Sequence, residues 1–273
     1  MRYSPLLLFI LWWLLQGSAP VAKSADKKLI KDYVFIPAGN VGDTAIAEFY
    51  ISSIEVNNQQ YRDFVNELQD SGALDKVKIV LPDSAQWDQV LRPCGPYLSS
   101  YFRHPAYNDY PVVNISRHAA ELYCTWLTEK YNATAKIKVH FLLPTEIQWE
   151  YAAKGGNLKA IYPWPGNSIQ YQKKGRYHGC NMCNYSVDSA HRSSSSPAKV
   201  VDITSPSRSY TPNTYEIYNM AGNVAEMLAD QPYTKGGSYL SPGDKVLISA
   251  HEYADLTHGS PFIGFRPVMV IER

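Results

Sequence analysis

The chain of 273 residues has no excess of either charge, because 26 Lys and Arg stand against 25 Asp and Glu, giving a formal net charge of +1. Proteins that bind nucleic acid present a strongly basic surface to the phosphates, so this balance argues against a nucleic-acid partner. The chain also has no hydrophobic run long enough to span a membrane, since the apolar run at 6–15 covers only ten residues. We therefore expect no transmembrane segment in the mature chain.

The histidines and cysteines do not form the usual metal-binding motifs. None of the seven His stands in a His-x-x-x-His pair, and of Cys94, Cys124, Cys180 and Cys183 only the last two form a Cys-x-x-Cys. A four-thiolate zinc site needs two such pairs. Four cysteines allow three disulfide connectivities, and for Cys180 and Cys183 a local disulfide and two unpaired thiols both stay open. Cys124 lies in an apolar helical stretch and is predicted to be a core residue.

The N-terminus has the pattern of a secretory signal peptide. Arg2 precedes the apolar run, small residues follow it, and Ala22-Lys23-Ser24 offers a small-x-small cleavage site. We predict a signal peptide at 1–25, one domain at 30–271 and an exported protein that is periplasmic or secreted. An uncleaved anchor is the alternative. Lipid anchoring is not supported, because no Cys follows the apolar run.

Aromatic residues and proline are abundant, with 21 Tyr, 6 Trp and 18 Pro. This composition favours an irregular fold whose loops are held by large flat side chains, and it excludes a helical bundle. Strands are predicted at 34–39 and 49–51, and irregular structure at 70–110 and 157–215. Three helices are predicted after the N-cap residues Asn57, Ser116 and Thr145, the last with a capping box to Gln148. The second helix is expected to bury Ala119, Ala120, Tyr123, Cys124 and Leu127.

Six motifs follow one another in order along the chain. They are YPVVNIS at 110–116, LPTEIQWEYAAKGG at 143–156, YPW at 162–164, YNMAGNVAE at 218–226, KGGSY at 235–239 and IGFR at 263–266. With this series the chain resembles the formylglycine-generating enzyme (sulfatase-modifying factor) domain family over nearly the whole mature chain. The resemblance implies an α+β fold related to C-type lectins with little regular secondary structure, in agreement with the composition.

The resemblance implies an oxidoreductase that uses copper and oxygen to convert a sulfatase cysteine to formylglycine. In the family two cysteines after Gly-Gly-Ser bind the copper, but here these positions hold Ser241 and Val246. Cu(I) is a soft ion that selects thiolate ligands. The tryptophan of the family's oxygen pocket is replaced by Ala225, whereas Ser238 is retained. We therefore expect no copper and a degenerate pocket at these four positions, as in a pseudoenzyme.

The resemblance also implies a calcium site. In the family an Asn side chain, two backbone carbonyls and a Glu surround the ion, and Asn219, Gly222, Val224 and Glu226 match that pattern. Oxygen ligands of this kind suit a hard cation, so calcium is the expected cofactor. The alternative is that Asn219 and Glu226 only hydrogen-bond the turn. Arg266 is expected to bind buried carbonyls.

Three functions follow from these observations. The first is an exported binding or structural module of the cell envelope, with a protein or a glycan of the envelope as its partner. The second is an oxidoreductase of the same family that uses a different metal or residue set in the equivalent pocket, drawing on Ser238, Ser241, Asp244 and His251. The third is a lectin-like carbohydrate binder, which rests on the fold and the aromatic content.

Overall fold

The computed structural model describes residues 30–89, 99–186 and 203–272. The predicted signal peptide and Cys94 lie outside these ranges. The helices are α1 (Asn58–Asp70), α2 (Leu74–Val80), α4 (Arg117–Thr134) and α5 (Glu146–Ala153), with 3-10 turns η1 (Ser84–Gln89) and η2 (Pro105–Tyr107). The strands are β1 (Tyr33–Ile36), β2 (Gly39–Val41), β3 (Thr44–Ile46), β4 (Phe49–Ser52), β5 (Val139–Leu142), β6 (Ala225–Met227), β7 (Tyr233–Lys235), β8 (His251–Tyr253), β9 (Ile263–Gly264) and β10 (Val268–Ile271).

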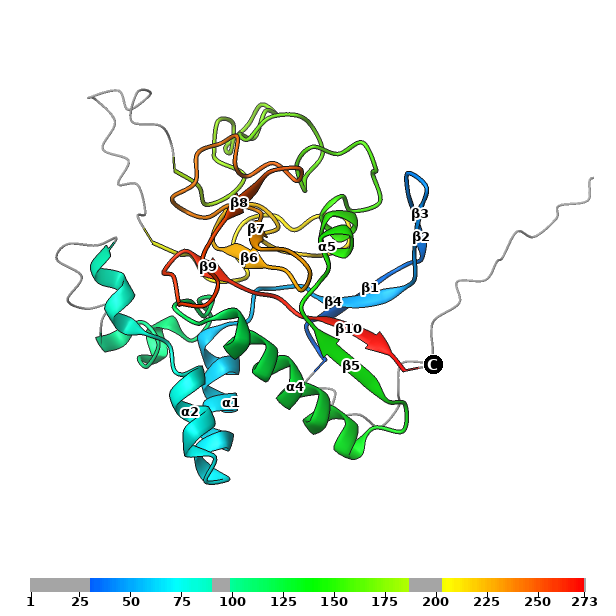
Figure 1. The fold of residues 1–273 in the computed structure, drawn as a ribbon. Coiled ribbons are helices and arrows are strands. Elements are labelled where there is room, and N and C mark those ends of the chain that lie inside the picture. The colour runs from blue at the N-terminus through cyan, green and yellow to red at the C-terminus, as the bar shows by residue number, and fades with distance from the viewer. Residues whose placement is uncertain (1–29, 90–98, 187–202, 273) are drawn as a thin grey trace, which may run out of the picture.

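An antiparallel sheet of order β1-β4-β10-β5 joins the first strands of the fold to the last (Figure 1). On one face its side chains pack with α1, α2 and α4, in a core that includes Tyr50, Phe141 and Met269. On the other face, residues such as Ile51 pack with Trp149 of α5. Both faces are therefore buried, and the ladder through β10 closes the domain.

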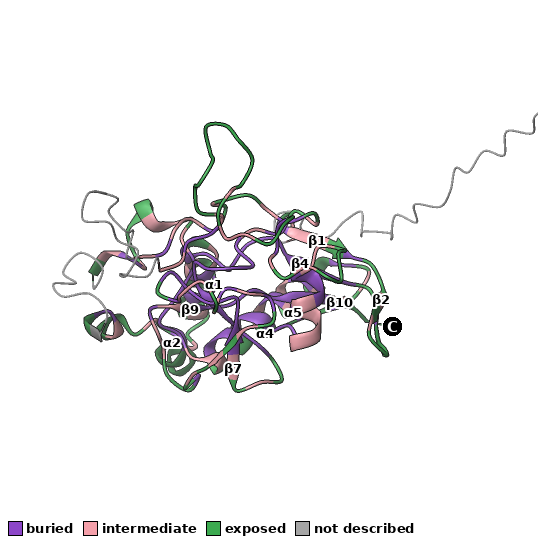
Figure 2. Cartoon of the chain, turned by 90° about the horizontal axis from the view of Figure 1, so that it is seen from above, coloured by how far each residue is buried: buried purple, intermediate pink, exposed green. Residues whose placement is uncertain are grey.

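A second sheet has the order β8-β7-β6-β9, in which β9 runs parallel to β6. A short hairpin of β2 and β3 projects beyond β1 (Figure 1). Long loops connect these short elements, and some of them are exposed along most of their length (Figure 2). The fold is α+β with little regular secondary structure, as predicted, and the described part of the segment predicted as mostly loop at 157–215 contains no helix or strand.

The predicted helix starts are confirmed. The side chain of Asn57 accepts a hydrogen bond from the backbone of Gln60 at the start of α1, and Gln60 reciprocates. Thr145 and Gln148 form the predicted capping box of α5. Ser116 caps α4 through the backbone N–H of Ala119. The buried stripe predicted for this helix is also confirmed.

The prediction of irregular structure throughout 70–110 is wrong, because α2 occupies part of it. The N-cap position Ala73 makes no side-chain cap bond, and the helix has only seven residues. Such a helix is marginal in isolation. Val77 and Val80 are buried in the core shared with α1 and α4. Tertiary packing therefore stabilises a helix that the local sequence does not predict.

The described cysteines are unpaired. Cys124 is buried in the core as predicted, Cys183 is buried and Cys180 is exposed. Cys180 and Cys183 therefore form no local disulfide and are two unpaired thiols. Burial raises the pKa of Cys183 to about 12, which keeps its sulfur protonated. Within the described ranges, no helix has both the length and the hydropathy to cross a bilayer.

Leu127→Ala is expected to lower the free energy of unfolding by about 2–5 kcal/mol, because it leaves a cavity beneath α4. Leu127 is 3% exposed, whereas Leu74, on α2, is 62% exposed. The matched control Leu74→Ala is expected to change the free energy by less than about 0.5 kcal/mol. Urea unfolding measures both, and equal losses in the two variants would contradict this core.

Candidate functional site

A fully buried ion pair lies at the centre of the domain, between Glu226 of β6 and Arg266, which follows β9. Their side chains are 1% and 0% exposed. The Arg266 Nη2 donates to Glu226 Oε1 at 2.7 Å and its Nε donates to Oε2 at 2.8 Å. This two-point geometry is the form of pairing in which a guanidinium compensates best for losing its water.

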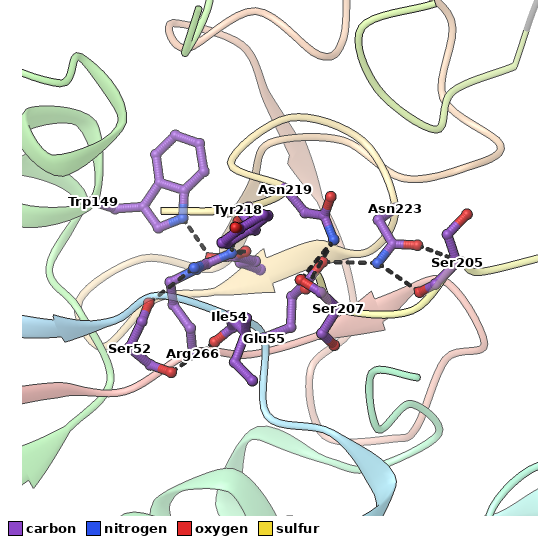
Figure 3. A network of polar contacts seen from close by, with 11 residues as sticks. Ser52, Ile54, Glu55, Trp149, Ser205, Ser207, Tyr218, Asn219, Asn223 and Arg266 are labelled. Carbon is purple, nitrogen blue, oxygen red and sulfur yellow. Dashed lines mark hydrogen bonds and ion pairs between the residues drawn. The ribbon is translucent and has the colours of Figure 1, made fainter. Parts of the chain in front are cut away.

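The remaining donors of this cluster are also used. Arg266 Nη1 and Nη2 donate to the carbonyl oxygens of Ser52 at 2.9 Å and Tyr218 at 2.8 Å, which confirms that this arginine binds buried carbonyls. The indole of Trp149 donates to Glu226 Oε2 at 2.7 Å. Both oxygens of Glu226 are therefore bonded, and the network ties β4, α5 and β6 together (Figure 3).

A second buried carboxylate, Glu55, lies beside this pair and is 0% exposed. Its oxygens accept hydrogen bonds from the side-chain amides of Asn223 at 2.9 Å and Asn219 at 3.2 Å. The same two amides donate to the backbone carbonyls of Ser205 and Ser207, both at 3.2 Å (Figure 3). Burial raises the pKa of Glu55 to about 7, although the nearby Arg266 acts in the opposite direction.

The oxygens around Glu55 are of the kind that a hard cation takes, but in this structure the amide N–H groups of Asn219 and Asn223 donate hydrogen bonds to them. One carboxylate, the carbonyls of Ser205 and Ser207 and two Asn side chains converge there (Figure 3). The Ser207 hydroxyl is buried and has no hydrogen-bond partner among the described residues. The described residues contain no group of three or more His, Cys, Asp and Glu that suits a metal ion. Calcium accepts carbonyl and amide oxygens together with a carboxylate, so the donor set suits calcium better than zinc or copper.

The predicted calcium ligands Asn219, Gly222 and Val224 lie on the turn that leads into β6. Asn219 and Gly222 have left-handed backbone conformations, with φ of 52° and 71°. A Cβ at Gly222 would lie 2.2 Å from the carbonyl oxygen of Asn184, so the turn requires glycine. Glu226, by contrast, is paired with Arg266 in this arrangement.

The carboxylate that contacts Asn219 is Glu55, which sequence reasoning missed. It lies between Ile54 and Val56, two residues before the N-cap Asn57. A carboxylate flanked by two buried apolar residues is an unusual pattern for a surface strand end. The apolar neighbours could have indicated that Glu55 is buried. They could not indicate its partners, because Asn219 and Asn223 lie more than 160 positions further along the chain.

The degenerate pocket positions Ser238 and Ser241 lie together after β7. The Ser238 backbone N–H donates to the Ser241 hydroxyl oxygen at 3.0 Å, and this hydroxyl donates to Glu252 Oε2 at 2.7 Å. The Ser238 hydroxyl accepts the backbone N–H of Leu240 at 3.2 Å. Ser238 and Ser241 are 3% and 6% exposed. Both hydroxyls are thus part of the hydrogen bonding of the turn.

The other two pocket positions are apolar and buried. Ala225 belongs to the main core, and Val246 packs in a small cluster with Trp164, Cys183 and Ala221. Cys183 is the one cysteine that the described residues bring into this cluster, and Cys180 is exposed. The Cys-x-x-Cys therefore does not supply a buried thiolate pair beside Val246.

Other polar residues do not join the pocket. Glu150 pairs with the buried Lys235 at 2.7 Å, and Glu146 lies 3.5 Å from the same ammonium. His251 is exposed on β8 and stacks on Tyr233, with ring centroids 4.3 Å apart. Asp244 is exposed. Neither His251 nor Asp244 is part of the hydrogen-bonded group formed by Ser238 and Ser241.

Arg266→Met is expected to lower the free energy of unfolding by about 3–5 kcal/mol, because it leaves Glu226 buried without its partner. The double variant Glu226→Met with Arg266→Met is expected to lose less than the sum of the two single changes. Lys78→Met, which breaks the exposed pair with Asp75, serves as control and is expected to cost less than about 1 kcal/mol. Additive losses in urea unfolding would contradict the coupling.

The sequence of this chain is similar to those of formylglycine-generating enzymes and of an inactive relative. Formylglycine-generating enzyme of Bos taurus is 28% identical over 224 residues, covering 75% of this chain and 54% of that protein. The one from Thermomonospora curvata is 35% identical over 156 residues, covering 55% and 44%. Inactive C-alpha-formylglycine-generating enzyme 2 of Bos taurus is 28% identical over 214 residues, covering 71% and 63%. The chain spans about half the length of these relatives.

Solved structures share the fold. CarF is 18% identical with a TM-score of 0.59, and the match covers 88% of this chain and 98% of CarF. PvdO from Pseudomonas aeruginosa is 19% identical with a TM-score of 0.58, and the match covers 87% and 93%. The family model of the sulfatase-modifying factor enzyme 1-like domain matches residues 17–271. This match over most of the sequence confirms the resemblance, and the chain belongs to the sulfatase-modifying factor family.

Proposed function

We propose that this family member does not generate formylglycine and acts as an exported binding or structural module of the cell envelope. The observation that carries the proposal is the content of the two copper positions. The hydroxyl of Ser241 is bonded to Glu252, and the alkyl side chain of Val246 is buried in an apolar cluster. Neither group is a thiolate, which is the ligand that Cu(I) requires.

The neighbouring thiol does not restore the site. Cys183 shares the cluster of Val246, but burial raises its pKa to about 12. A protonated thiol is a poor metal ligand and a poor nucleophile. The similarity to an inactive relative, 28% identical over 214 residues, is consistent with a family scaffold kept without its chemistry.

The alternative is an oxidoreductase that uses a different metal or residue set in the equivalent pocket. The chain of polar groups from Ser238 through Ser241 to Glu252 favours it, because these side chains are kept in a largely apolar region. Only one carboxylate takes part in that chain. We favour the module, since a redox metal needs several strong ligands in one place.

Export and calcium are parts of the same proposal. The leader-like pattern at 1–25 supports export to the periplasm or the medium. We propose a calcium ion bound near Asn219, with Glu55 and the carbonyls of Ser205 and Ser207 as its oxygen ligands in place of Glu226; the amides of Asn219 and Asn223, which now donate to these oxygens, would turn away to admit the ion. The ion would hold the 203–207 segment against the turn before β6. The partner is a protein or a glycan of the envelope.

The activity test uses the protein purified in the presence of copper and a peptide that carries the cysteine motif of a sulfatase. We expect no aldehyde product by mass spectrometry, because two thiolates are missing. The double variant Ser241→Cys with Val246→Cys is expected to bind Cu(I) more tightly than the parent in a chelator competition. Copper-dependent aldehyde formation by the unaltered chain would overturn the proposal.

The calcium test compares thermal unfolding with a chelator and with added Ca²⁺. An ion present at about 100 times its dissociation constant adds about 2.7 kcal/mol of stability, so a rise in Tm of several degrees is expected. Glu55→Gln should abolish the rise. Glu252→Gln, which alters the other pocket, should retain it. Loss of the rise in Glu252→Gln, or no rise in the parent, would count against this site.

A further inference from the structure

One stretch of the chain carries a concentrated positive charge. Between Glu150 and Asp188 there is no acidic residue, although the chain has 25 Asp and Glu in total. Lys154, Lys159 and three cations at 173–176 lie in this interval. We call residues 154–182 the basic segment. Its positive charge is balanced in the net charge of +1 by an excess of acidic residues in the rest of the chain.

The most prominent part of this segment is a hairpin-like loop at 169–182. The Met182 N–H donates to the Ile169 carbonyl, and the Tyr171 N–H donates to the Cys180 carbonyl, both at 2.9 Å. Ten successive residues at its tip, 172–181, are exposed. Figure 1 draws this part of the chain in green above β8, at the end of the molecule opposite α1 and α2. The ordered base therefore presents the tip to solvent.

The tip carries Lys173, Lys174 and Arg176, and no carboxylate of the described residues pairs with them. None of the five Lys and Arg of the basic segment forms an ion pair with a carboxylate of the described residues. The adjacent loop touches the base of the hairpin, since Gly243 lies against Ile169. That loop adds Asp244 and Lys245, which cancel.

Apolar side chains are exposed on the same segment. Tyr177 at the tip is 60% exposed, and Leu158 and Ile161 are 51% and 45% exposed. The Arg176 guanidinium lies 5.9 Å from the centroid of the Tyr177 ring. Tyr162, next to Ile161, packs on the same cluster as Ile169 at the hairpin base. The exposed Ile161 and the hairpin therefore leave the body of the domain close together.

We infer that the basic segment docks the domain on an anionic phospholipid surface. Interleaved cations and exposed apolar or aromatic side chains suit the lipid interface, where cations meet headgroup phosphates and apolar groups enter the acyl boundary. A dissolved anionic polymer offers charge alone and gives no reason for exposed Leu158 and Ile161. The inference does not rest on the absence of catalysis and holds for either chemistry of the pocket.

The experiment measures co-sedimentation with phosphatidylcholine vesicles with and without 30% phosphatidylglycerol, using full-chain variants that share the same N-terminus. The triple variant Lys173→Glu, Lys174→Glu and Arg176→Glu is expected to lower the partition coefficient on anionic vesicles by at least about 100-fold, since each lost cation contributes about fivefold and the added carboxylates are repelled by the surface. The matched control reverses three exposed cations elsewhere, Lys76, Lys78 and Lys136, and is expected to stay within about threefold of the parent.

A second variant separates lipid from polymer. Leu158→Ser with Ile161→Ser is expected to weaken vesicle binding about tenfold while leaving binding to soluble heparin unchanged. The inference is overturned by equal binding to neutral and anionic vesicles, by an equal loss in the control triple variant, or by vesicle binding that is indifferent to Leu158→Ser with Ile161→Ser. Unchanged thermal unfolding shows that each exposed substitution leaves the fold intact.

Discussion

The ion pair between Glu226 and Arg266 is the constraint on which the rest of the domain depends. Glu226 lies in a strand of three residues and Arg266 lies in the connection between β9 and β10, so neither segment has much stability of its own, yet the ion pair joins them. Arg266 also holds the carbonyls at Ser52 and Tyr218. A buried charge without a partner is very costly, so every alternative packing that separates these residues is strongly disfavoured. A fold with few long helices and strands gains uniqueness from such an interaction.

The sequence predicted those features that local chemistry determines. The N-caps Asn57, Ser116 and Thr145 are defined by contacts within three residues, and the stripe of α4 follows from helical periodicity. The contacts of Arg266 with carbonyls came from the motif and not from spacing. By contrast, α2 has no side-chain cap and exists because Val77 and Val80 pack in the core. That information lies in other parts of the chain.

Glu55 shows the same limit at the candidate site. Its amide partners Asn219 and Asn223 are distant in sequence, and they meet it because β10 pairs with β4 and brings the C-terminal half of the chain against the N-terminal half. The family motif around Asn219 predicted an ion and assigned Glu226 as its carboxylate. In the structure Glu226 is paired with the guanidinium of Arg266, and the carboxylate that contacts Asn219 is Glu55. Motif spacing identifies the turn, whereas only the tertiary structure identifies which charges face it.

The packing around Ser241 and Val246 does not depend on a cysteine at either position. The glycine turn after β7 and the packing of Val246 require close approach and apolar surface, which serine and valine satisfy as well as cysteine does. The residue type at these two positions therefore has little effect on the packing that holds the fold. The tip of the basic segment is likewise independent of the core, because the ten residues 172–181 are all exposed. A domain built in this way changes its surface and its pocket without changing the buried pair that fixes its topology.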